Sequence, residues 1–240
     1  MITHARKGIT FVGILAMLFL IVSWWGADQL ASPPRRPLQD YHREFLANPR
    51  AHGVVVKPFV CDDGTPCLLC EPAPQSDVSA RGQRVREQLQ QKKITLPPPG
   101  TMIGNIVLIH GRRGRKEDYL LIAERFCAVG FRCILLDLPA HGDHPARIAC
   151  YGVKEAGLPT MVLREAALRF GFDPQPAGIM GISMGGAVGV RAASAKGAGW
   201  RAAVLVSTFD SLENVVRHQT TELAGSWCGS LWGEYDSLDL

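Results

Sequence analysis

Residues 177–196, AGIMGISMGGAVGVRAASAK, decide the fold of this chain. They comprise an apolar run, a pentapeptide of the form Gly-x-Ser-x-Gly centred on Ser183, and a run of small residues. This order predicts a strand, a sharp turn and a helix, because a tight turn needs tiny residues at Gly181 and Gly185. Ser183 would then stand exposed at the apex of the turn, with the backbone N–H of Met184 at the start of the helix.

The alternative for this stretch is a Gly-Ser turn that merely closes a buried strand, since short motifs also match by chance. The strand before the turn and the small-residue helix after it favour the functional interpretation. Ser183 is therefore predicted to be a nucleophile.

The surrounding sequence alternates between apolar runs and helix-favouring segments. Strands are predicted at 106–110, 131–138, 177–182 and 202–209, and helices at 117–129, 160–170, 184–196 and 211–223. This rhythm predicts right-handed crossovers in a mostly parallel sheet with buried strands and helices on both faces, an α/β fold. The ligand site is expected at the carboxyl ends of the strands.

A smaller β element precedes this core. Residues 53–71 contain two extended runs on either side of an Asp-Asp-Gly turn at 62–64, which predicts a β-hairpin. The proline-rich break at 97–100 follows, and the core is expected to begin at 104. The domain that carries the hairpin and the core is accordingly predicted to span residues 53–240.

Composition limits the class of protein. The chain has 240 residues, of which 47% are hydrophobic, enough for one sizeable α/β core. The net charge of +4 comes from 26 basic and 22 acidic residues that are well mixed along the chain. This balance does not indicate nucleic-acid binding.

The N-terminus carries a localisation signal. His4, Arg6 and Lys7 precede residues 8–27, a stretch without charge that is long enough to span a bilayer core of about 30 Å. We expect residues 1–7 in the cytoplasm, an uncleaved transmembrane anchor at 8–27, a linker at 28–52 and the remaining chain on the extracytoplasmic side. A cleaved secretory signal is the alternative.

Seven cysteines fit an oxidising compartment in part. Cys61, Cys67 and Cys70 flank the predicted hairpin turn, and folding the hairpin would bring Cys61 near either of the other two. One disulfide is expected there, with the pairing left open. The Cys-x-x-Cys spacing at 67–70 lacks a second ligand pair at finger-like spacing, so no metal and no cofactor are expected.

Three motifs together resemble the α/β-hydrolase superfamily, in particular membrane-anchored or secreted serine hydrolases with a His-Gly oxyanion loop. These motifs are Leu108-Ile109-His110-Gly111, Asp137-Leu138-Pro139-Ala140-His141-Gly142 and Gly181-Ile182-Ser183-Met184-Gly185-Gly186, in that order. The resemblance covers roughly residues 53–224. It implies a serine esterase or peptidase that acts on a small-molecule ester or amide.

The resemblance also implies roles for single residues. The backbone N–H groups of Arg112 and Met184 would form the oxyanion hole, and the Arg112 side chain would be free. His110 would position the oxyanion loop, with Gly111 beside it, and His141 would pack near the site without transferring protons. The arginines around Gly114 are expected to form a solvated loop, the alternative being an anion site.

The acid and the base of a catalytic triad are not recognised after Ser183. In this family both follow the serine in the chain, but residues 225–240 contain neither an acid turn nor a histidine loop. Asp210 and His218 are a poor substitute pair, because eight helical residues separate them by ~12 Å. We therefore expect an N-terminal part of a hydrolase, inactive or nearly so as written. The alternative is a non-catalytic hydrolase-like binding domain.

Overall fold

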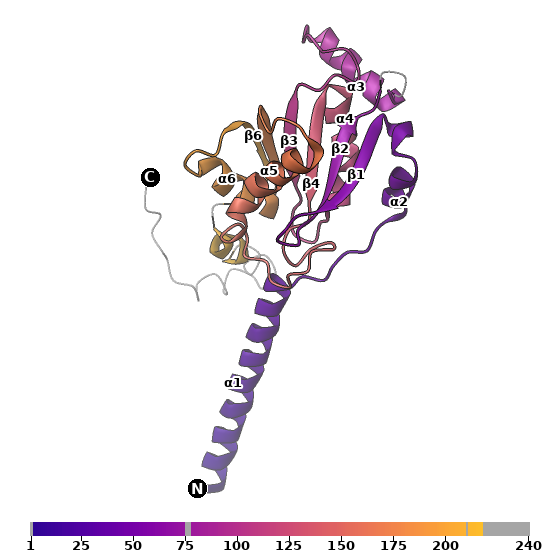
Figure 1. Ribbon diagram of the computed structural model, residues 1–240. Coiled ribbons are helices and arrows are strands. Elements are labelled where there is room, and N and C mark those ends of the chain that lie inside the picture. Colours follow the sequence, from indigo (N-terminus) through magenta and orange to yellow (C-terminus); the bar gives the residue numbers. More distant parts are fainter. Residues whose placement is uncertain (1, 75–77, 210, 218–240) are drawn as a thin grey trace.

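The computed structural model describes residues 2–74, 78–209 and 211–217 (Figure 1). Six strands form one sheet in the order β1-β2-β4-β3-β5-β6. The strands are β1 (Val54–Val60), β2 (Pro66–Pro72), β3 (Gly104–Ile109), β4 (Phe131–Leu136), β5 (Ala177–Ile182) and β6 (Trp200–Val206). The helices are α1 (Ile2–Ala31), α2 (Asp40–Ala47), α3 (Ala80–Gln91), α4 (Leu120–Ala128), α5 (Leu158–Phe170) and α6 (Met184–Ser194). Single 3-10 turns are η1 (Pro49–His52), η3 (Lys116–Tyr119) and η4 (Glu155–Gly157).

The sheet is mostly parallel, which confirms the predicted α/β class. β3 pairs in parallel with β4 and with β5, and β5 pairs in parallel with β6. The hairpin of β1 and β2 adds to the β4 edge in antiparallel orientation, with Val60 opposite Pro66 at its turn. The carboxyl ends of β3, β4, β5 and β6 therefore lie at one edge of the sheet.

Two apolar clusters lie on opposite faces of this sheet. In β3, Val107 and Ile109 belong to the cluster that includes residues of α5 and α6, whereas Ile106 and Leu108 belong to the cluster that includes α4. This division follows from the two-residue period of a strand. Figure 1 shows α5 and α6 on one side of the sheet and α4, with α3 beyond it, on the other. Covering both faces explains why β3 and β4 are continuous apolar runs.

The prediction that residues 202–209 form a buried strand is wrong in its burial. β6 ends at Val206, and side chains along it are exposed, Val204 by 50% and Val206 by 40%. The reason is that β6 lies at the end of the strand order and pairs with β5 alone within the described part of the chain.

The end of α1 contacts the body at the loops that follow the strands. The backbone N–H of Ala149 donates to the carbonyl oxygen of Ala31 at 2.8 Å, and Ser32 Oγ donates to the carbonyl oxygen of Arg147 at 2.8 Å. Arg35 donates to the carbonyl oxygen of Gly142 at 3.2 Å, so the start of the predicted linker lies against the same loop. Beyond this contact α1 projects away from the body (Figure 1). None of the helices within the described residues combines the length and the apolarity needed to cross a membrane.

Candidate active site

Ser183 occupies the turn between β5 and α6 with a strained backbone. Its φ is 52° and its ψ is −117°, a region that L residues rarely adopt. Such a conformation costs of order 1–3 kcal/mol and persists where the surrounding structure holds it. Here the Ser183 N–H donates to the carbonyl oxygen of Val206 at 2.9 Å, and the Ser183 carbonyl oxygen accepts from the N–H of Ala187 at 3.0 Å. The serine is therefore locked between β6 and the first turn of α6.

The glycines of the pentapeptide are required by close backbone contacts. A Cβ on Gly181 would lie 2.1 Å from the carbonyl oxygen of Gly185, and a Cβ on Gly185 would lie 2.3 Å from the carbonyl oxygen of Ile109. Gly186 is equally confined, because its Cβ would lie 2.8 Å from the Cβ of Thr208. The turn therefore tolerates no side chain two positions before or two positions after Ser183.

The predicted oxyanion loop lies beside this turn. A Cβ on Gly111 would lie 3.5 Å from the Cβ of Ser183 and 3.2 Å from the carbonyl oxygen of Ile182. Arg112 follows directly on Gly111, and Met184 is the first residue of α6, where a backbone N–H has no acceptor within its own helix. The structure therefore brings Gly111, Arg112, Ser183 and Met184 together at the carboxyl ends of β3 and β5.

His110 is buried and ties two loops together. Its Nδ1 is 2.8 Å from the carbonyl oxygen of Gly111, and its Nε2 accepts the N–H of Leu138 at 3.0 Å. Burial lowers the pKa of His110 below its usual value, so the ring is neutral and donates through Nδ1. Because both ring nitrogens are engaged, His110 positions the loop after β3 against the loop after β4.

His141 packs against His110 in the same region. The ring centroids are 5.2 Å apart, and His141 Nδ1 lies 2.8 Å from the carbonyl oxygen of Pro139. Burial, together with the neighbouring His110, lowers the pKa of His141 to about 4. Its Nε2 is buried and has no hydrogen-bond partner among the residues that the structure describes.

A buried ion-pair cluster ties the loop after β3 to the loop after β4, and sequence reasoning missed it. Asp137 has no exposed surface, and its carboxylate accepts from Lys116 Nζ at 2.8 Å, from the Lys116 N–H at 2.7 Å and from the Asp143 N–H at 2.9 Å. Burial by itself would lower the pKa of Lys116, but the charge of Asp137 outweighs it and the pKa is raised. A buried polar residue directly after a strand was the available signal, since such residues need partners.

The arginines around Gly114 fit the predicted solvated loop only in part, since Arg113 is exposed. Arg115 is 4% exposed and pairs with Glu117 at 2.6 Å. The Arg112 guanidinium donates to the Tyr151 hydroxyl at 3.2 Å and to the carbonyl oxygen of Gln29 at 2.7 Å. These guanidinium groups are used inside the molecule because the loop packs between the core and the end of α1.

Asp143 and His144 lie close to His141 in the sequence, but their side chains have different partners. Asp143 pairs with Lys116, whereas His144 lies 3.3 Å from the Thr65 hydroxyl. Within the described ranges, no group of three or more histidine, cysteine or acidic residues is arranged to hold a metal ion.

Of the three hairpin cysteines, two face each other. Cys61 Sγ and Cys67 Sγ lie 3.9 Å apart as thiols, while Cys70 is buried elsewhere, with its carbonyl oxygen accepting from the thiol of Cys127.

The predicted substitutes for the acid and base, Asp210 and His218, lie outside the described residues, as does the tail at 225–240. Among the residues that the structure does describe, Ser183 Oγ has no hydrogen bond to a histidine or a carboxylate. Both ring nitrogens of His110 are engaged, whereas His141 is engaged through Nδ1 alone.

The mostly parallel sheet with a serine at a strained strand–helix turn defines the class as an α/β-hydrolase fold. A model of the alpha/beta hydrolase family matches residues 106–233. That match covers more than half of the chain, and the protein belongs to the alpha/beta hydrolase family.

The solved structure of an esterase shares the fold. An esterase from Pyrococcus furiosus superposes with a TM-score of 0.56 at 14% identity, covering 81% of this chain and 62% of the esterase. A second crystal form of that esterase gives a TM-score of 0.53 at 15% identity, with 80% and 65% covered. S-formylglutathione hydrolase from Staphylococcus aureus matches with a TM-score of 0.47 at 17% identity, with 68% and 61% covered.

The chain thus spans less than two thirds of the length of these structures. At such identities the likeness shows the fold. No curated protein matches the chain significantly.

Proposed function

We propose that the protein is a serine hydrolase that cleaves an ester or amide bond through an acyl-enzyme on Ser183. The observation that carries this proposal is the strained backbone of Ser183, at φ 52°, with the backbone of Gly111 packed against it. Backbone strain of this kind lowers the stability of the fold, and strained residues cluster at active sites, so the strain at Ser183 favours a functional role. Membership of the alpha/beta hydrolase family supports the same conclusion.

The chemistry assigns a distinct part to each group. Ser183 Oγ forms a bond to the substrate carbonyl carbon and gives up its proton to a base, while the carbonyl oxygen becomes an oxyanion. The N–H groups of Met184 and Arg112 stabilise that oxyanion, a contribution typically worth 10²–10³ in rate for one donor. Collapse releases an alcohol or amine, which takes up a proton. Water then cleaves the acyl-enzyme to a carboxylic acid and restores the Ser183 hydroxyl.

The base is not assigned among the described residues. His110 has both ring nitrogens engaged, and His141, with a pKa of about 4, is a weak base at neutral pH. The second candidate function, a hydrolase-like domain that binds a ligand without cleaving it, rests on this same observation.

Labelling with a fluorophosphonate probe separates the two candidates. The full chain is compared with Ser183→Ala and with Ser194→Ala, a matched control at the exposed end of α6. Labelling that is lost in Ser183→Ala and retained in Ser194→Ala supports an activated nucleophile. A folded protein that remains unlabelled overturns the hydrolase proposal for this chain and leaves the binding domain.

We also propose that residues 8–27 attach the protein to a membrane as a single-pass anchor, with the hydrolase domain on the extracytoplasmic side; this proposal rests on the sequence of that stretch, because none of the helices in the described residues is long and apolar enough to cross a membrane. Support comes from the uncharged stretch at 8–27 and from the exposed apolar side chains of α1, such as Phe19 and Trp24, both 72% exposed. Apolar surface of this extent is stable in lipid rather than in water.

Extraction with alkaline carbonate tests this attachment, and intact mass distinguishes an anchor from a cleaved signal. A full-length chain that stays in the membrane pellet supports the anchor. A full-length chain released by carbonate, or a chain shortened near residue 27 or 31, refutes it.

A further inference from the structure

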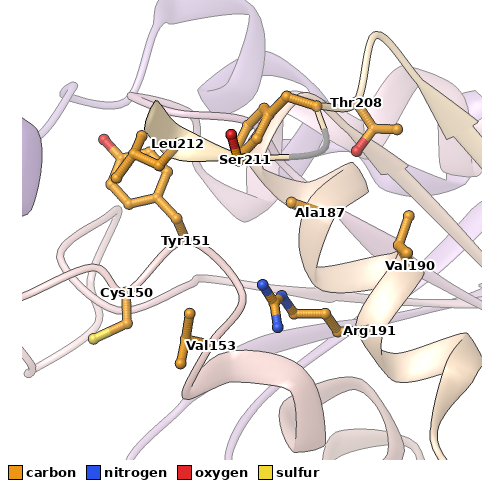
Figure 2. A pocket seen from close by; sticks show the side chains of 10 residues that line it. Cys150, Tyr151, Val153, Ala187, Val190, Arg191, Thr208, Ser211 and Leu212 are labelled. Atoms are coloured by element: carbon orange, nitrogen blue, oxygen red, sulfur yellow. The ribbon is translucent and has the colours of Figure 1, made fainter. Parts of the chain in front are cut away.

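A cavity of about 660 Å³ lies directly beside the serine turn (Figure 2). Its walls come from α6, from the loop at 150–153 and from Thr208, Phe209, Ser211 and Leu212. One wall residue, Ala187, donates its N–H to the Ser183 carbonyl oxygen at 3.0 Å, and another, Thr208, packs against Gly186. The cavity therefore begins within one helical turn of Ser183, and its volume is in the range of sites that bind small molecules. We call it the α6 cavity.

The α6 cavity is largely apolar but contains one cationic side chain among the residues that line it. Tyr151, Val153, Val190 and Leu212 contribute rings and methyl groups, and none of the lining residues is acidic. The guanidinium of Arg191 extends from α6 into the space that these side chains surround (Figure 2). In the described part of the chain, no carboxylate pairs with this guanidinium, in contrast to Arg115 and Arg132, which both have carboxylate partners.

The wall opposite Arg191 is held in place before any ligand binds. The Glu155 carboxylate is 3% exposed and accepts the N–H groups of Cys150 at 2.6 Å and of Gly152 at 2.9 Å. This carboxylate is satisfied by backbone donors of its own loop. The Tyr151 hydroxyl is engaged as well, donating to the carbonyl oxygen of Leu30 at 2.9 Å, so its ring is left to line the cavity.

We infer that the α6 cavity binds an apolar chain or ring that ends in a carboxylate, with Arg191 as the partner of that carboxylate. Arg191 is exposed in the free protein, so an anion with an apolar body would cover its guanidinium on binding, and a charge-assisted hydrogen bond strengthens as water is excluded. Arg191 is eight residues beyond Ser183 on α6, which places the anionic end ~12 Å along the helix from the serine. Resting on the proposed function, this makes the substrate an ester or amide whose acyl or leaving part carries a distant carboxylate.

Equilibrium binding tests this inference independently of catalysis. The probe is 5-phenylpentanoate, and its neutral counterpart is 5-phenylpentanamide, each titrated calorimetrically into the full chain held in amphipol. We expect the carboxylate to bind more tightly than the amide. Arg191→Met should weaken carboxylate binding about tenfold and leave amide binding unchanged, as expected for loss of one charged hydrogen bond.

Matched variants keep the outcome interpretable. Arg191→Lys retains the charge and should bind the carboxylate nearly as the wild type does, and Arg164→Met, an exposed arginine on α5, should have no effect. Equal affinity for carboxylate and amide, or carboxylate binding that Arg191→Met leaves unchanged, overturns the inference. Ser183→Ala should bind both probes as the wild type does. If the fluorophosphonate does not label the wild type, the proposed reaction is refuted but the carboxylate-binding site is not.

Discussion

Replacement of Lys116 by methionine tests how strongly the buried ion pair with Asp137 stabilises the loop after β3. The substitution keeps the length of the side chain and removes its charge, which leaves the fully buried Asp137 carboxylate without the Nζ donor at 2.8 Å. Breaking a buried pair on one side typically costs about 3–5 kcal/mol. Two backbone N–H donors, of Lys116 and Asp143, remain on the carboxylate, so we expect the lower end, about 3 kcal/mol.

Urea unfolding followed by tryptophan fluorescence measures this cost. With an m-value of about 2 kcal/mol/M, the midpoint should fall by about 1.5 M. Lys154→Met, an exposed lysine in the loop before α5, is the matched control and should stay within about 0.5 kcal/mol of the wild type. Since Asp137 raises the pKa of Lys116 above its unfolded value near 10.4, the pair contributes fully below that pH, and the difference should be constant from pH 6 to 9.

A double-mutant cycle shows whether the cost belongs to the pair. Asp137→Asn removes the charge and keeps one acceptor oxygen, so Lys116→Met should be less costly by about 2 kcal/mol when asparagine is already present. Strict additivity of the two substitutions, or a change of less than about 0.5 kcal/mol for Lys116→Met alone, would refute the reasoning.

Three further outcomes follow from the geometry. Gly185→Ala should destabilise the fold by about 3 kcal/mol or more, because its Cβ would lie 2.3 Å from a backbone oxygen at the end of β3. Gly178→Ala is the control, since its Cβ would be 3.5 Å from its nearest neighbour, and equal thermal stability of the two variants would contradict the expectation. His141 has a pKa of about 4 in the fold and 6.5 when unfolded, so lowering the pH from 7 to 4 should reduce the stability of the wild type by up to ~3 kcal/mol. His141→Asn should not show this loss. Urea midpoints of the two proteins that change in parallel with pH would argue against it. Under oxidising conditions Cys61 and Cys67, whose sulfurs lie 3.9 Å apart, should form a disulfide that a non-reducing peptide map detects. A disulfide from either residue to another cysteine would refute this prediction.

The sequence was sufficient to predict the bounds of those helices and strands that depend on neighbouring residues. β5 begins and ends as predicted at 177–182, and α6 begins at Met184 directly after the serine, because Gly181 and Gly185 specify the turn between them. The helix at 160–170 was predicted to end before Gly171, which adopts a left-handed φ of 70° at its C-terminus. The strand at 202–209 was less accurate: an apolar run specifies a strand, but its place at the edge of the sheet depends on the order of all six strands.

The features of the candidate site likewise fall into those that adjacent residues specify and those that depend on residues far apart in the chain. The sequence by itself determined the serine turn and the two motif loops that follow β3 and β4, since adjacent residues impose their backbone geometry. The tertiary structure decided the partners of the charges: Lys116 pairs with a residue 21 positions away, and Arg112 reaches the carbonyl oxygen of Gln29, 83 positions away. Arg191 likewise lines a cavity that exists only after three separate segments have packed. Charge and hydrogen-bonding capacity are properties of a residue, but burial and distance to a partner arise when distant segments meet.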